Sequence, residues 1–357
     1  MRKDYIYDKH VEYFISKCEG FLSQSSDKKI DQKHENLLEE FKKIYKKDKK
    51  SFINNLRNWS HHGDLSCPPQ ITFMHIKYLG FIKTIFTFIK KKIKFFDLKF
   101  FNQSFFDDIE ILKVTGSLEI LKKNPVHKTP QCNDFYYFEK TSSNYRWNRY
   151  AYLLNKIKQE KLITDNCNFV DIGSFYGGFQ SYLKNFYPKV NLILLDFNHQ
   201  LCRSYVFLKN LFPGSQHTLP DEIIDLDFLN KNQNQIVYLP IEKRSLLKKL
   251  KIQLTTNFFS FGEMKREMFS EYFKLIDHSK YIYSVNRFVS SPFFEKTYDS
   301  DLDVRDYLKN NYSTLYFDIF PMHHYLNIKR KLLNRYANRP IGSPYFELIL
   351  KKNENRR

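Results

Sequence analysis

Residues Asn168–Gly178 read NFVDIGSFYGG, an apolar run that passes directly into a glycine-rich turn. This order predicts a buried strand, a tight turn and the start of a helix. Glycine suits such a turn because a side chain would block a ligand from the backbone and would strain a positive φ. The next apolar run, LILLDF, carries Asp196 at its last but one position, 23 residues after Gly173. An acidic side chain at that place can accept hydrogen bonds from two ribose hydroxyls, so the pair of runs predicts a nucleoside site.

Short apolar runs alternate with amphipathic segments downstream of the turn, which indicates βαβ units and a parallel sheet. The expected strands are Asn168–Ile172, Leu192–Phe197, Gln235–Leu239, Leu254–Phe259, Tyr281–Val285, Leu315–Phe320 and Tyr345–Leu350, and the expected helices are Phe179–Phe186, Gln200–Leu211, Lys265–Ile276 and Tyr325–Tyr336. Five βα steps and two terminal strands match the seven-stranded, Rossmann-like α/β sheet of class I methyltransferases, whose last strand is antiparallel. The alternative is a doubly wound sheet whose glycines only allow tight turning.

The first third of the chain has a different pattern of apolar residues. Apolar residues recur at helical spacing up to about residue 60 and again from residue 70, and Asn124-Pro125 ends the pattern. We therefore expect a mainly helical, basic N-terminal region at residues 1–135, followed by the Rossmann-like domain at residues 140–357.

Positive charge is the main compositional feature: 58 Lys and Arg stand against 39 Asp and Glu, a net charge of +19. Lysines crowd at positions 42–50 and again at Lys90–Lys94, directly after the apolar stretch Phe81–Ile89. Such a segment suits an anionic membrane surface, nucleic acid or an acidic glycan. Because Lys far outnumbers Arg, which bidentate phosphate recognition prefers, nucleic acid is less favoured than a membrane surface. A solvated, lysine-rich surface without a partner is the remaining interpretation.

The sequence favours a cytoplasmic protein, with attachment to the inner membrane surface as a second expectation. No apolar signal segment follows the first residues, and charged residues interrupt the most apolar stretch at 68–89. Five cysteines lie far apart without CxxC spacing, which favours reduced thiols and excludes a cysteine-rich zinc site. No HxH, HExxH or DxD spacing indicates a metal, so we expect none.

Several motifs resemble the sugar O-methyltransferase family, S-adenosylmethionine enzymes encoded with bacterial surface-polysaccharide genes. They are FVDIGSFYGGFQSYL at 169–183, LILLDF at 192–197, LKNLFPG at 208–214, FFSFGEM at 258–264 and YIYSVNRF at 281–288. The resemblance runs from about Asn144 to the C-terminus. Phe175 stands where the family has a glycine that faces the cofactor, which leaves open a shifted cofactor pose or weakened binding.

The resemblance implies an S-adenosyl-L-methionine site at the glycine turn. Asp171, Gly173 and Gly177 would form the turn, and Asp196 would hold the ribose. Residues around Tyr238, after the third strand, would border the adenine.

The resemblance places the methyl acceptor, a sugar hydroxyl of a surface glycan or of its nucleotide-linked or lipid-linked precursor, above the fourth and fifth strands. Ser260 and Asn286 would contact it there. Removing the hydroxyl proton is a task for a carboxylate or a histidine. Glu263 is the first candidate and the pair His323 and His324 the second, while the alternative role of Glu263 is to stabilise the start of the following helix.

Two other functions remain open. One is a methyltransferase acting on RNA, a lipid or a small molecule, which the positive charge would suit. The other is a non-catalytic binding module with a degenerate cofactor turn, which Phe175 would suit.

Overall fold

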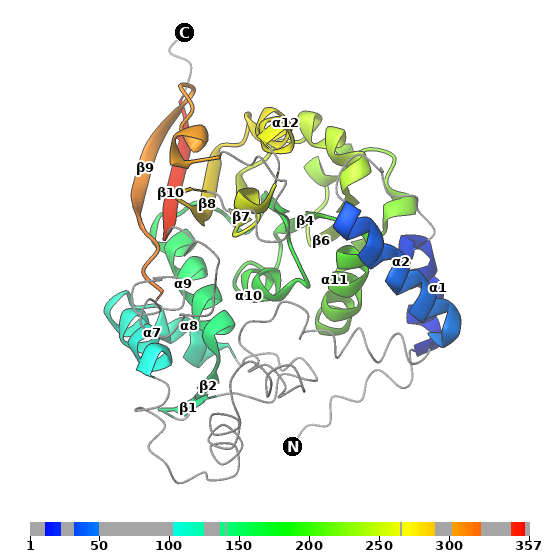
Figure 1. Cartoon of the computed structure of the whole chain (residues 1–357), viewed down its shortest axis with the longest axis horizontal. Coiled ribbons are helices and arrows are strands. Elements are labelled where there is room, and N and C mark those ends of the chain that lie inside the picture. The colour runs from blue at the N-terminus through cyan, green and yellow to red at the C-terminus, as the bar shows by residue number, and fades with distance from the viewer. Residues whose placement is uncertain are drawn as a thin grey trace.

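The chain folds around a central eight-stranded sheet with helices on both faces (Figure 1). The computed structural model describes residues 11–22, 32–49, 103–124, 136–139, 141–264, 266–289, 302–322 and 344–353. The α-helices of this described part are α1 (Val11–Leu22), α2 (Gln32–Lys47), α7 (Gln103–Val114), α8 (Leu118–Lys123), α9 (Tyr145–Gln159), α10 (Gly178–Phe186), α11 (Asn198–Leu211) and α12 (Arg266–Ile276). The strands are β1 (Tyr136–Phe138), β2 (Thr141–Ser143), β3 (Asn168–Ile172), β4 (Asn191–Asp196), β5 (Gln216–Thr218), β6 (Gln235–Pro240), β7 (Leu254–Phe258), β8 (Tyr281–Arg287), β9 (Tyr312–Ile319) and β10 (Tyr345–Lys352).

The strand order confirms the expected Rossmann-like methyltransferase sheet. The order is β5-β6-β4-β3-β7-β8-β10-β9, and β10 runs antiparallel to both of its neighbours. The chain moves from β3 through β4 to β6 and then returns to the other side of β3 with β7 and β8. The strand order therefore reverses at β3, and ligand crevices of open α/β sheets form at the carboxyl ends of strands at such a point.

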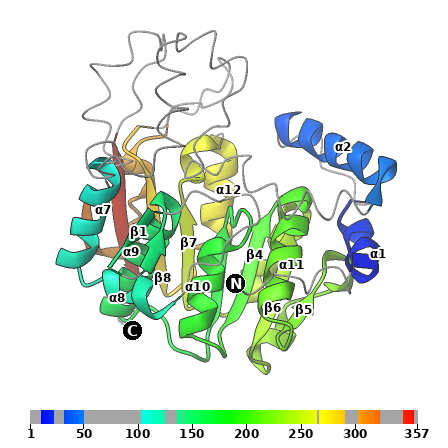
Figure 2. The ribbon, with the colours of Figure 1, turned by 90° about the horizontal axis from the view of Figure 1, so that it is seen from below.

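Strand pleating separates the core into two layers. In β4, Leu192 and Leu194 pack into the cluster that includes residues of α9, α10 and α11, whereas Ile193 and Leu195 pack into the cluster that includes α12. All four side chains are at most 1% exposed. The alternation explains why these parallel strands read as continuous apolar runs, since both faces of the sheet are covered (Figure 2).

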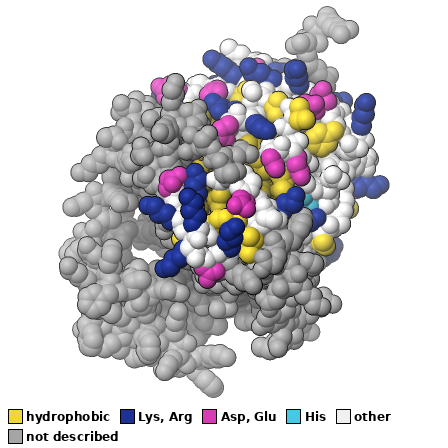
Figure 3. Space-filling view, turned by 90° about the vertical axis from the view of Figure 1, so that its right-hand side faces the viewer, with side chains coloured by type: hydrophobic (Ala, Val, Ile, Leu, Met, Phe, Trp, Pro, Cys, Tyr) yellow, Lys and Arg dark blue, Asp and Glu magenta, His cyan; other side chains and the backbone are white. Residues whose placement is uncertain are grey.

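The helices α1 and α2 pack onto α11 at one side of the sheet. Phe21 of α1 lies edge-on to Tyr238 of β6, with ring centroids 5.9 Å apart, and Phe41 of α2 lies 5.4 Å from the ring of His199 at the start of α11. The face that carries α1 and α2 presents Lys and Arg side chains interspersed with Asp and Glu (Figure 3). In the described part of residues 1–135 the elements are the helices α1, α2, α7 and α8.

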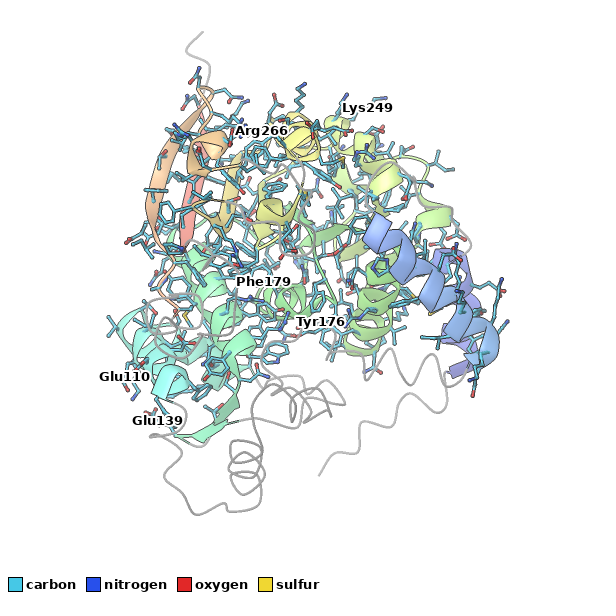
Figure 4. The ribbon with its side chains drawn as sticks, in the orientation of Figure 1. Glu110, Glu139, Tyr176, Phe179, Lys249 and Arg266 are labelled. Carbon is cyan, nitrogen blue, oxygen red and sulfur yellow. The ribbon has the colours of Figure 1, made fainter. Side chains whose placement is uncertain are left out.

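The helices α7 and α8 are joined to the β1–β2 hairpin by ion pairs. Glu139, at the tip of the hairpin, accepts from Lys113 of α7 at 3.2 Å and from Lys122 of α8 at 3.3 Å. Glu110 pairs with the same Lys113 at 3.0 Å, and Figure 4 labels both carboxylates at this corner. Exposed pairs of this kind contribute little stability, about 0–1 kcal/mol each.

Three features differ from the sequence expectations. The sheet has an eighth strand, β5, which pairs with β6 at the edge. The hairpin β1–β2 and the helix α9 were not expected as separate elements. The expected helix Tyr325–Tyr336 and the basic cluster Lys90–Lys94 lie outside the described residues. Among the residues that are described, no helix is both long and apolar enough to cross a membrane.

Candidate active site

The turn after β3 enters left-handed backbone conformations at Gly173 (φ +79°), Phe175 (φ +54°) and Gly177 (φ +88°). The N–H of Gly173 donates to a carbonyl at the end of β4 over 2.9 Å, which fastens the turn to the neighbouring strand. A Cβ on Gly173 would collide with the side chain of Ser260, and one on Gly177 would collide with Leu208. Both positions therefore require glycine for their conformation and for their space. Tyr176, which Figure 4 labels, belongs to the same turn.

Phe175, which is half-buried, occupies a conformation that a bulky side chain rarely adopts, and neighbouring residues hold its backbone and its ring. Its N–H donates to Asp196 Oδ2 at 2.8 Å, and its carbonyl accepts from Ser204 Oγ at 2.5 Å. Its ring lies between two guanidinium groups, 4.9 Å from Arg146 and 4.8 Å from Arg203. A non-glycine residue in this region costs on the order of 1–3 kcal/mol, which these contacts offset.

Asp196 ends β4 directly beside this turn. Its Oδ2 accepts the N–H of Phe175 and its Oδ1 accepts the N–H of Phe197, both at 2.8 Å. Burial raises the pKa of Asp196 to about 7, against the opposing effects of these two hydrogen bonds and of Arg203. Each carboxylate oxygen has a further lone pair, so Asp196 can still accept hydrogen bonds from a ligand.

Two buried polar atoms beside Asp196 have no hydrogen-bond partner among the described residues. They are Ser174 Oγ in the turn and Asn198 Oδ1 at the start of α11. Both residues are at most 4% exposed. Buried polar atoms are nearly always paired, so these two indicate a place for a ligand or an ordered water at the carboxyl ends of β3 and β4.

Asp171 lies within β3, and its carboxylate is bonded inside the protein. It accepts from Thr256 Oγ1 of β7 at 2.5 Å and from the side-chain amide of Gln180 in α10. Its pKa is raised to about 7, mainly by burial and in part by the neighbouring Asp196, against the opposing effects of the two hydrogen bonds. The side chain is 4% exposed, so it supports the turn by joining β3, β7 and α10.

Ser260 and Asn286, expected at the acceptor side, are joined through a third residue, Asn257 at the end of β7. Asn257 donates to Ser260 Oγ at 3.2 Å, and its Oδ1 accepts from Asn286 Nδ2 at 2.9 Å. The same Oδ1 accepts the N–H of Phe261 at 2.9 Å, and Asn286 Oδ1 accepts the N–H of Gly262 at 3.2 Å. This network sets the path of the chain from β7 into the turn that carries Glu263. Asn257 was not among the expected site residues, because it follows two threonines in the strand LTTNF and nothing in that composition singles it out.

Glu263 is exposed at the end of the short 3-10 turn Phe261–Glu263. It lies near enough to Tyr345 of β10 to raise the pKa of that phenol, although burial is the larger cause. Tyr345 also accepts a hydrogen bond from Arg287 at 3.1 Å. The guanidinium of Arg149 packs on the ring of Phe259 at 4.2 Å and lowers the pKa of Tyr345. Charged side chains from α9, β8 and the turn Phe261–Glu263 thus surround Tyr345 at this end of the sheet.

Tyr238 lies deeper than the sequence analysis placed it. Its side chain is 0% exposed, its hydroxyl lies 2.9 Å from His217 Nδ1, and its ring packs edge-on against Tyr205 of α11 at 5.3 Å. It therefore belongs to the core beneath α11. The residue of β6 that pairs with Asp196 at the strand ends is Pro240.

The second pair of candidate bases, His323 and His324, lies outside the described residues. Within the described ranges, His, Cys, Asp and Glu side chains form no group of three that could hold a metal ion.

Neither a protein-family model nor a curated protein matches the sequence. Solved structures similar to the chain include the methyltransferase domain of bacterial CtHen1, with 12% identity, a TM-score of 0.34 and coverage of 58% of this chain and all of that one. An rRNA methylase from Streptococcus thermophilus shares 14% identity at a TM-score of 0.31, over 54% and 91% of the two chains. A mutant of MtNAS in complex with S-adenosylmethionine shares 12% identity at a TM-score of 0.36, over 98% and 99%. The fold assignment rests on the strand order of this chain itself.

Proposed function

We propose that this chain is an S-adenosyl-L-methionine-dependent methyltransferase whose acceptor is a sugar hydroxyl of a bacterial surface glycan or its precursor. One observation carries the cofactor part of the proposal. Asp196 retains acceptor capacity, and close to it in the chain Ser174 Oγ and Asn198 Oδ1 are buried polar atoms without a partner among the described residues, at the point where the strand order reverses. This is a site that a polar nucleoside would fit.

The residues present suit such a cofactor. Asp196 would accept the ribose hydroxyls, and Ser174 and Asn198 would bond other polar atoms of the ligand. The backbone N–H and carbonyl of Phe175 are already hydrogen-bonded within the protein, so neither group needs the cofactor as a partner. The bound cofactor would supply an electrophilic methyl group.

The acceptor hydroxyl has to be held in line with that methyl group and has to lose its proton. Glu263 would accept this proton because it is exposed and lies at the end of the turn that the Asn257–Asn286 network positions. Tyr345 is the poorer candidate, because burial raises the pKa of its phenol, which therefore stays protonated near neutral pH and cannot accept the proton. The choice of a sugar rests on the sequence motifs, above all SFGEM at 260–264 and Asn286.

Calorimetry with S-adenosylmethionine and S-adenosylhomocysteine tests the cofactor part. Binding of both supports the proposal, whereas no heat with either would favour a non-catalytic module, the alternative that Phe175 suggests. Transfer of labelled methyl groups to surface polysaccharide precursors then tests the acceptor. Label that appears in RNA or lipid but not in sugar would overturn the sugar assignment and leave the methyltransferase assignment standing.

A further inference from the structure

Two cysteines meet where α1 packs on α11. Cys18 and Cys202 are both free thiols with 0% exposure, and the side chain of Cys18 is hydrogen-bonded to that of Cys202. Three residues further along each helix, Phe21 packs on Tyr205 with ring centroids 5.6 Å apart. The two helices are therefore in direct contact on the faces that carry the thiols. Neither thiol takes part in the candidate active site.

We infer that Cys18 and Cys202 are a redox-active pair, which a low-molecular-weight disulfide converts into a covalent link between α1 and α11. Interhelical disulfides need side chains that face each other at close range. The hydrogen bond between the two thiols and the contact between α1 and α11 place these side chains together.

The chemistry requires one molecule of oxidant. The thiolate of one cysteine attacks a sulfur of the small disulfide, a mixed disulfide forms, and one small thiol leaves. The second cysteine then attacks the protein sulfur of the mixed disulfide and releases the other small thiol. Two protein thiols are oxidised, one disulfide is reduced, and the two protons leave with the two small thiols.

Burial controls the rate of this reaction. The pKa of the Cys18 thiol is raised well above its usual range, mainly by burial and next by the contact with Cys202. The thiols of the packed protein are therefore protected, and α1 has to lift from α11 before an oxidant reaches them. At high oxidant concentration the oxidation rate should become independent of that concentration, because helix opening then limits it.

The link would act on the part of the molecule that shapes the cofactor turn. Arg203 and Ser204 directly follow Cys202, and both contact Phe175. Since the two cysteines are 184 residues apart in the sequence, the cross-link would also restrict the unfolded chain strongly. We expect the oxidised protein to melt about 5–10 °C above the reduced one.

The experiment treats the full-length protein with oxidised glutathione, blocks the remaining thiols and maps disulfides by mass spectrometry without reduction. The expected product joins the peptides that contain Cys18 and Cys202, and dithiothreitol reverses both the link and the gain in melting temperature. Cys202→Ser should abolish both effects, and Cys18→Ala does the same if the first variant folds poorly.

Cys167→Ser is the matched control, because Cys167 is a half-buried free thiol away from this contact, and it should leave the link intact. The inference is overturned if no Cys18–Cys202 peptide forms under conditions that oxidise other cysteines of the chain, or if the melting temperature does not change when the peptide forms. Both outcomes are independent of cofactor binding and of methyl transfer.

Discussion

The carboxylate of Asp196 accepts the backbone N–H of Phe175, 2.8 Å away and 21 residues earlier in the chain. The residue expected to hold a ribose thus also holds the turn in which a bulky side chain replaces glycine. Ligand binding and local folding are coupled at this pair. A change at either residue should therefore be read with both a binding assay and a stability assay.

The variant Asp196→Asn should weaken binding of S-adenosylhomocysteine by roughly 10- to 150-fold, because hydrogen bonds to a charged group contribute about 1.5–3 kcal/mol. The melting temperature should fall as well, since the amide keeps only one acceptor oxygen for the two backbone N–H groups. Calorimetry and a thermal melt measure the two effects. Asp227→Asn, at an exposed position of a 3-10 turn, is the control and should change neither. Unchanged affinity in Asp196→Asn would remove the ribose role.

The left-handed backbone conformation of Phe175 leads us to expect different stabilities for two variants at this position. Phe175→Ala loses the ring contacts and keeps the strain at φ +54°, whereas Phe175→Gly loses the same contacts and relieves the strain. The glycine variant should therefore be more stable than the alanine variant by about 1 kcal/mol in urea unfolding. Val114, 86% exposed at the end of α7, provides the comparison. There alanine should be the more stable of the two, because glycine is the poorer helix former. If alanine were the more stable variant at both positions, backbone strain at Phe175 would be contradicted.

The buried carboxyl of Asp171 predicts a pH dependence of stability. Its pKa is raised to about 7 in the folded protein, from a usual value near 3.8. Between these values the folded state binds more protons than the unfolded state, so this residue lowers the free energy of unfolding as the pH rises from about 4 to 7. In Asp171→Asn the free energy of unfolding should depend less on pH over this range. The stability of the variant relative to the wild type should therefore be greater at pH 7.5 than at pH 5. Urea unfolding at the two pH values measures it, and parallel slopes would contradict the raised pKa.

The sequence was informative where one local pattern decides a structure. The apolar runs of β3 and β4 were located to within a residue, because both faces of these strands are buried and leave a continuous signal. β5 has only three residues, Gln216–Thr218, and their polar composition carries no strand periodicity. It becomes a strand by pairing with β6, which only the tertiary structure provides.

The sequence predicted which strand ends carry the candidate site, but it did not predict which way each side chain points. Tyr238 lies within the expected strand, β6, yet the pleat turns its ring into the core beneath α11. Asn257 is the reverse case, since it follows two threonines in the strand LTTNF, where nothing in the sequence singles it out, and yet it connects Ser260 with Asn286. A single sequence gives the spacing of residues along a strand, whereas these roles depend on which neighbour each side chain meets.

Glu263 gives the prediction that tests the proposed chemistry most directly. Glu263→Gln keeps the shape of the side chain and can still form hydrogen bonds, but it cannot accept the acceptor's proton. Turnover should fall by roughly 10²–10⁴, the usual contribution of a positioned base, while affinity for S-adenosylhomocysteine and the melting temperature stay close to those of the wild type. A methyl-transfer assay, calorimetry and a thermal melt measure the three quantities.

Glu267→Gln is the control that distinguishes a catalytic base from a residue that only stabilises a helix start. Glu267 is an exposed acidic residue in the first turn of α12. If both variants lose only a few tenths to about 1 kcal/mol of stability and keep their turnover, Glu263 merely stabilises the start of the helix, as Glu267 does. His323 and His324 then become the candidate bases, and their joint substitution by Asn tests them. Loss of cofactor binding in Glu263→Gln would place the carboxylate in the cofactor pocket, since a base for the acceptor has no reason to affect the affinity for S-adenosylhomocysteine.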